Sequence, residues 1–212
     1  MPVKRLLLLV PALVLASCNS VYYAAWEKLG WEKRDLLVSA VKSARSEQKE
    51  AGEEFQDALT QLQKLTGYRG GNLESAYNKF KAEYEDCEAQ ATKVRSEIRE
   101  VDQVARDLFR EWEREIRQYE NASLAADSRA KLADTRSRFE QLSASLHAAE
   151  SSMDPVLRQF RDQVLYLKHN LNAAAIGSLR GKADVIQSDI QRLLAQMNRS
   201  IAEADRFIQT MK

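Results

Sequence analysis

Hydrophobic residues recur along most of this chain in alternating steps of four and three residues, the spacing of a coiled-coil heptad. The longest unbroken run is Leu73, Tyr77, Phe80, Tyr84, Cys87, Ala91, Val94, Ile98, Val101, Ala105, Leu108 and Trp112. This spacing predicts one helix from about 73 to 119.

The segment before this run repeats the same pattern. Its inward positions are Leu37, Val41, Ala44, Gln48, Ala51, Phe55, Ala58, Leu62 and Leu65. Between the two runs, Gly67-Tyr68-Arg69-Gly70-Gly71-Asn72 holds three glycines in six positions, which favours a turn. A helix over about 32–66 is therefore predicted to form a hairpin with the next one.

Two further helices are predicted after a short turn at Glu120-Asn121-Ala122-Ser123. The third has inward positions Leu132, Thr135, Phe139, Leu142, Leu146, Ala149, Met153, Val156, Phe160, Val164 and Leu167. Asp154-Pro155 could cap and start a separate helix, but the pattern passes through it in phase, so we expect one kinked, collinear helix. The fourth follows Asn172, with Ile176, Leu179, Ala183, Ile186, Ile190, Leu193, Met197, Ile201 and either Phe207 or Ile208 inward.

The predicted fold class is all-α, an elongated, antiparallel, coiled-coil-like four-helix bundle over residues 32–212 with up-down-up-down connections. Composition agrees, because the chain has only 7 Gly and 3 Pro and is 30% charged. Because Cys87 occupies a heptad position, we expect it to be buried and unreactive. Tyr77, Tyr84 and Trp112 are expected to pack in the core or a groove rather than form a ligand cage.

The first 17 residues are typical of a cleaved export signal. Lys4 and Arg5 precede an apolar stretch over 6–16, about half of the ~20 residues that a membrane-spanning helix needs. Leu15-Ala16-Ser17-Cys18 resembles the lipobox of bacterial lipoproteins, which implies cleavage before Cys18 and lipidation of that cysteine. An ordinary secretory signal that leaves Cys18 free is the alternative.

Residues 18–31 are predicted to be a lipidated, membrane-proximal segment with four aromatic residues, Tyr22, Tyr23, Trp26 and Trp31. Tyr22, Trp26 and Leu29 share one helix face, which could lie among lipid headgroups. We favour packing of these side chains onto the 73–119 helix around Leu108 and Trp112, because that helix extends beyond the start of the 32–66 helix. Asn19 stands where an aspartate would usually indicate inner-membrane retention, so the expected location in a Gram-negative host is the outer membrane, facing the periplasm.

The charge balance argues against nucleic-acid binding, and the cysteine content excludes an intrachain disulfide. Without Lys4 and Arg5, 30 basic residues face 31 acidic ones, so no global basic field for nucleic acid is expected. Once Cys18 is acylated, Cys87 is the only thiol, and no intrachain disulfide can form.

Candidate catalytic motifs are incomplete, and we expect no enzyme, cofactor or metal. The stretch 177–183 has three residues between its glycines instead of the four of a phosphate loop, and it ends in alanine. His147 has Glu150 one turn on, but no Glu-x-x-His pair exists to build a di-iron core. His169 has no nucleophile fixed beside it by spacing.

Several strings resemble an uncharacterised family of helical bacterial lipoproteins, classed as a domain of unknown function. They are YYAAWEKLGWEKRDLLV, LFREWEREI, YENASL and MDPVLRQFRDQVLYLKHNLNA. The resemblance covers nearly everything from the lipobox to the C-terminus and implies no activity or catalytic residue. Some relatives carry a DNA-repair ATPase label, but the incomplete phosphate loop and the export signal argue against that activity here.

The functional hypothesis is an envelope lipoprotein that acts as a periplasmic scaffold or binding module. The predicted partner-binding tip combines both distal turns: Tyr68, Arg69, Asn72, Lys168, His169, Asn170 and Asn172. These residues could dock an envelope protein or an anionic polymer, or could simply serve as turn and capping residues. The alternative function is a carrier or regulator that binds a lipid or peptide in an apolar groove, which a wide bundle lined by Tyr77, Tyr84 and Trp112 would favour.

Overall fold

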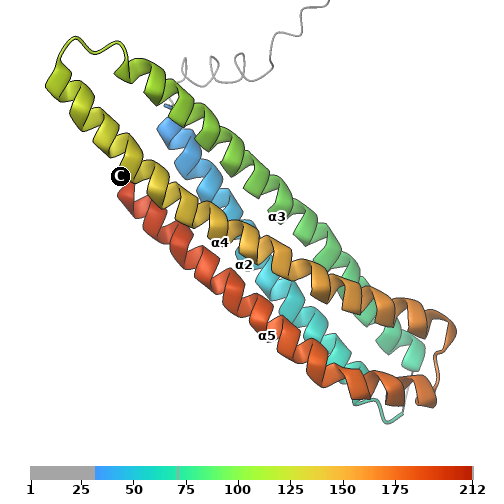
Figure 1. Ribbon diagram of the computed structural model, residues 1–212. Helices are drawn as coiled ribbons and strands as arrows, with labels where there is room; N and C mark the ends of the chain where they lie inside the picture. Colours follow the sequence, from blue (N-terminus) through green and yellow to red (C-terminus); the bar gives the residue numbers. More distant parts are fainter. Residues whose placement is uncertain (1–31, 71, 212) are drawn as a thin grey trace, which may run out of the picture.

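The computed structural model describes residues 32–70 and 72–211, which form four long helices and, within these ranges, no strand. In chain order they are α2 (Lys33–Thr66), α3 (Leu73–Ile116), α4 (Ala122–His169) and α5 (Ala173–Thr210). The predicted all-α helical bundle is confirmed (Figure 1).

Each helix packs against the helices that precede and follow it around the bundle. α2 and α4 both contact α3 and α5, and consecutive helices run in opposite directions (Figure 1). The heptad positions meet in a continuous core. In it the Phe160 ring lies edge-on to Phe80 at a centroid distance of 5.5 Å and stacks with Phe55 at 6.4 Å. Aromatic side chains from three helices thus fill one layer.

Helix α4 runs without interruption through Pro155, as the in-phase hydrophobic positions predicted. Asp154 does not cap a new helix but forms an ion pair with Arg95 of α3, with an N–O distance of 2.5 Å. Met153 and Val156 are both buried on either side of the proline. Packing of these neighbours offsets the backbone hydrogen bond that proline cannot donate.

The prediction that Ile201 faces the core is wrong in its register. After Met197 the buried positions are Ser200, Ala204 and Phe207, and Ile201 is only half-buried. Hydrophobicity favoured Ile201 for the core. The observed steps of three, four and three residues from Met197 to Phe207 instead place the small residues Ser200 and Ala204 there. This register lets the Phe207 ring contact Phe139 at a centroid distance of 6.0 Å.

The hairpin of α3 and α4 extends beyond the start of α2 and the end of α5 (Figure 1). Lys33 Nζ lies 2.5 Å from Glu111 Oε1, so α3 continues past the first residue of α2. In the extension, Trp112 Nε1 donates to Ser128 Oγ at 2.8 Å, so α4 covers part of the surplus α3 surface. α3 ends at Ile116, three residues before the predicted limit.

We call this end, which also holds residue 32, the proximal end, and the end with the turns at 67–72 and 170–172 the distal end. Within the described ranges, none of the helices combines the length and the apolar character needed to cross a bilayer.

Candidate functional site

The two turns of the predicted tip lie at the same end of the bundle (Figure 1). The Arg180 guanidinium of α5 donates two hydrogen bonds to the carbonyl oxygen of Thr66, the last residue of α2, at 3.0 and 2.7 Å. On the other side, Tyr77 Oη at the start of α3 donates to the Val164 carbonyl oxygen near the end of α4 at 3.5 Å. These contacts hold the turns side by side.

The three asparagines of the tip satisfy the helix ends. Asn72 Oδ1 accepts a hydrogen bond from the Ser75 N–H at 2.9 Å, and Asn172 Oδ1 accepts one from Ala175 N–H at 3.0 Å. Asn170 Nδ2 donates to the carbonyl oxygen of Tyr166 at 3.0 Å. Each amide therefore pairs with backbone groups that a helix terminus leaves without partners, which is a structural role.

The charged residues of the tip are differently placed. Arg69, Lys168 and His169 are exposed, and none of the three side chains has a hydrogen bond or ion pair with the described part of the chain. Tyr68 is half-buried. Gly70 has a φ of +146°, a backbone conformation that side chains disfavour, so the turn needs glycine there. The tip thus presents cations and an imidazole to solvent on a defined turn.

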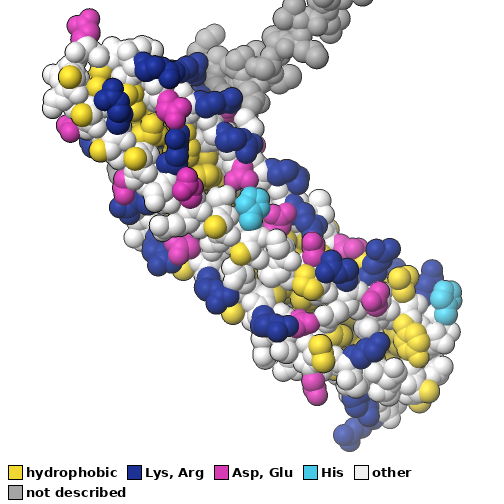
Figure 2. All heavy atoms as spheres, in the orientation of Figure 1, with side chains coloured by type: hydrophobic (Ala, Val, Ile, Leu, Met, Phe, Trp, Pro, Cys, Tyr) yellow, Lys and Arg dark blue, Asp and Glu magenta, His cyan; other side chains and the backbone are white. Residues whose placement is uncertain are grey.

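Two exposed hydrophobic residues beside the tip were missed by the sequence analysis. Leu165 is 52% exposed and Tyr166 is 44% exposed, both in the last turns of α4. They lie between the inward positions Val164 and Leu167, so their outward orientation was implicit in the heptad pattern. Figure 2 shows hydrophobic and basic side chains interspersed on the surface toward this end.

An acidic group lies between α2 and α3, closer to the middle of the bundle. Carboxylate oxygens of Glu54, Glu83 and Asp86 all lie within 4.8 Å of one another. Burial, together with the charges of Asp86 and Glu83, raises the pKa of Glu54 above its usual range. These are the residues of the described chain that could best hold a cation, but exposed carboxylates commonly gather without one, and we assign them no metal role.

The remaining reactive side chains are engaged in structure. Cys87 is buried, and burial together with the charge of Glu54 raises the pKa of its thiol, so the reactive thiolate is disfavoured. His147 of α4 contacts Asp102 of α3 and Glu150 of its own helix, each at 2.9 Å. It therefore links two helices through a surface network.

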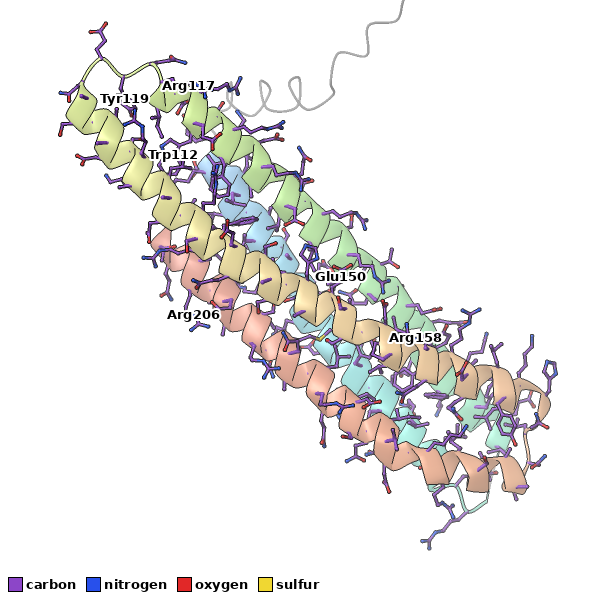
Figure 3. All side chains as sticks on the ribbon, viewed as in Figure 1. Trp112, Arg117, Tyr119, Glu150, Arg158 and Arg206 are labelled. Atoms are coloured by element: carbon purple, nitrogen blue, oxygen red, sulfur yellow. The ribbon has the colours of Figure 1, made fainter. Side chains whose placement is uncertain are left out.

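The aromatic residues proposed to line a carrier groove do not form one. Tyr77 and Tyr84 are buried in the core, and Trp112 packs between α3 and α4 in the proximal hairpin (Figure 3). An open hollow does lie between α2 and α5, and its lining includes Gly52, Leu194 and Met197. No predicted site residue contributes to this hollow.

The predicted lipidation site Cys18 and the aromatics Tyr22, Tyr23, Trp26 and Trp31 lie outside the described residues. Their roles stay predictions.

Comparison with known proteins gives a family but no activity. Residues 22–211 match the family model described as a protein of unknown function, DUF2959. No curated protein and no solved structure matches the sequence. Since the match spans nearly the whole chain, including all four helices, the protein belongs to the DUF2959 family of proteins of unknown function.

Proposed function

We propose that this protein is an envelope lipoprotein whose helical bundle is a rigid scaffold that presents its distal end to a partner. Acylated Cys18 would hold the proximal end at a membrane, and we assign it to the outer membrane, on the periplasmic face. Support for the anchor comes from the lipobox-like residues at 15–18 and the apolar stretch before them.

The observation that carries the binding role is the position of the exposed tip residues. Arg69, Lys168 and His169 lie at the end of the bundle opposite residue 32. The 34 residues of α2 separate the two ends by about 50 Å at 1.5 Å per residue. Charged turns at the end of a rigid rod are well placed for recognition, because binding there needs no rearrangement of the bundle.

We favour docking at this surface over catalysis and over a carrier function. The buried Cys87 and the hydrogen-bonded His147 have structural surroundings, and Tyr77 and Tyr84 fill the core. The three capping asparagines contribute shape to the tip rather than free hydrogen-bonding groups.

Site-specific photo-crosslinking in intact cells tests the proposal. A crosslinking residue at position 69 or 169 should capture a partner, whereas one at the exposed Ser46, in the middle of α2, should not. Equal capture from Ser46, or none from the distal positions, would contradict a distal binding end.

A matched pair of variants adds a second test. Capture is measured here from a crosslinking residue at the exposed Ser178, near the start of α5. Replacing Arg69, Lys168 and His169 with alanine should abolish this capture but leave helicity and the melting temperature nearly unchanged, because these side chains are exposed. The control replaces Lys42, Arg99 and Arg114, which are exposed but lie elsewhere on the bundle, and it should capture the partner normally.

A further inference from the structure

The distal end carries a strong excess of basic residues in a chain that is almost neutral. Residues 64–79 and 158–184 together hold eight Lys and Arg residues but only three acidic ones, Glu74, Asp162 and Asp184. The rest of the chain holds 24 basic and 28 acidic residues. The fold therefore separates charge along its length, because it brings these two distant segments to one end.

The basic residues of α4 and α5 extend this surface well beyond the tip. Arg158, Arg161 and Lys168 are exposed on α4, with exposed Leu165 between them. Their spacing of three, four and three residues places these four side chains on one helix face. Arg158 is seen on the distal half of α4 in Figure 3. On α5, Arg180 and Lys182 are also exposed.

The remaining three basic residues continue the surface across α2 and α3. Lys64, Arg69 and Lys79 are exposed, and Lys64 and Lys79 line one hollow between the two helices together with Asn72, Ser75 and the acidic Glu83. The cations therefore occur on all four helices and surround the distal end. We call the eight Lys and Arg residues the distal basic surface.

None of these eight side chains forms an ion pair within the described part of the chain. Arg180 alone uses its guanidinium internally, in the hydrogen bonds to Thr66. Elsewhere on the bundle, half-buried arginines pair with carboxylates of neighbouring helices, as Arg45 does with Asp205 and Arg136 with Glu113. Unpaired like charges gathered at one end repel one another, and an anionic ligand would relieve that repulsion.

We propose that the distal basic surface binds a flexible anionic polymer that carries phosphate or carboxylate groups. This inference rests on the proposed function and specifies its partner. Charge complementarity selects a polyanion, and the distribution of the cations selects a flexible one. The cations lie around four helices, and Arg158 is 11 residues, about 16 Å, from the last residue of α4. A flat membrane could contact only the cap of the bundle, whereas a flexible chain can reach all of these cations. Tyr166 and Leu165 add apolar contact area beside the charges.

Binding of long-chain inorganic polyphosphate and of polygalacturonate to the full chain tests the inference. The Cys18→Ser substitution removes the acyl chain from all samples, and neutral dextran serves as the uncharged probe. A distal variant carries Arg158→Gln, Arg161→Gln, Lys168→Gln and Lys182→Gln. The matched control carries Lys42→Gln, Arg99→Gln, Arg114→Gln and Arg129→Gln, which remove the same charge from exposed positions outside the distal end.

We expect both polyanions to bind and dextran not to bind. The distal variant should lose affinity on the order of 100-fold, and its slope of log affinity against log salt should fall by about three, since each cation releases roughly 0.7 counterion from a single-stranded polyanion. The control variant should bind nearly as the parent does. Equal losses in both variants, or unchanged binding by the distal variant, would overturn the inference.

Vesicles of phosphatidylglycerol provide the competing ligand. Binding of the vesicles but of neither polymer would overturn the inference in favour of a lipid surface. Failure of the proposed function has a different outcome, the absence of distal crosslinks in cells. Crosslinks from the distal end could instead capture a partner that carries no anionic polymer and binds with an affinity that does not depend on salt. That result would support the proposed distal binding end and refute only the inference that its partner is an anionic polymer.

Discussion

The Arg180 guanidinium of α5 and the carbonyl oxygen of Thr66 are joined by two hydrogen bonds, at 3.0 and 2.7 Å, across 114 residues of sequence. Thr66 ends α2, so its carbonyl has no partner within its own helix. The contact thus gives the last carbonyl oxygen of α2 a hydrogen-bond partner. It also holds the two distal turns side by side.

Replacing Arg180 with alanine should loosen the distal end. We expect the free energy of unfolding to fall by about 1 kcal/mol, the scale of a charge-assisted hydrogen bond at a partly exposed site. Urea unfolding followed by circular dichroism measures the change. Hydrogen exchange should accelerate at the last turn of α2 and the first turns of α5 but not at the proximal hairpin. Arg180→Lys is the control, and it should retain part of the stability.

The buried Gln48 side chain should limit stability. Gln48 is fully buried in α2, and neither its amide nitrogen nor its amide oxygen has a hydrogen-bond partner among the described residues. Gln48→Leu should therefore raise the free energy of unfolding by about 1–2 kcal/mol, because it removes an unsatisfied polar group from the core. Urea titration of the two proteins measures this difference.

Gln90→Leu is the matched control for this substitution. Gln90 is also buried, but its Nε2 donates to the Glu47 carbonyl oxygen at 3.2 Å and to Glu47 Oε2 at 2.7 Å. Its replacement should destabilise the bundle. A loss of stability in Gln48→Leu as large as in Gln90→Leu would contradict the assignment of Gln48 as unsatisfied.

His147 should make stability depend on pH near neutrality. Partial burial lowers the pKa of His147, but hydrogen bonds and charge interactions with Glu150 and Asp102 outweigh it and raise the pKa above the ordinary 6.5. A raised histidine pKa stabilises the fold fully below the unfolded value, and this contribution is lost as the pH rises through the folded pKa. His147→Gln should therefore destabilise the protein below pH 6 and have little effect well above the folded pKa.

Melting temperatures of the two proteins across this pH range test the sign. His169→Gln is the control for the loss of an imidazole, because this histidine is exposed and no carboxylate contacts it among the described residues. A constant difference between parent and His147→Gln at all pH values would show that the effect is not electrostatic.

The proposed anchor predicts a simple change in localisation. Cys18→Ser should abolish labelling by a fatty-acid analogue and release the protein from the membrane fraction, because the acyl chains supply the membrane affinity. Cys87→Ser, which removes a buried thiol, should remain labelled and membrane-bound. Unchanged labelling of the Cys18 variant would contradict the lipoprotein proposal.

The sequence by itself determined the number of helices, most of their limits and most of the core. The hydrophobic positions from Leu73 to Trp112 repeat so regularly that only one helical register buries them together. The same periodicity explains why α4 continues through Pro155, since a break there would have displaced Met153 and Val156 from the core. Local pattern was sufficient in these cases because the burial of one helix face depends on residues three and four positions apart.

Only the tertiary structure decided which distant residues meet and which charges remain unpaired. The contact of Arg180 with Thr66 and the choice of Ser200 over Ile201 in the core depend on how α5 packs against its neighbours. The distal basic surface likewise has no counterpart in any continuous stretch of sequence, because its cations come from segments almost 80 residues apart. Packing between helices sets these distances, and electrostatic interaction depends on distance in space rather than on separation along the chain.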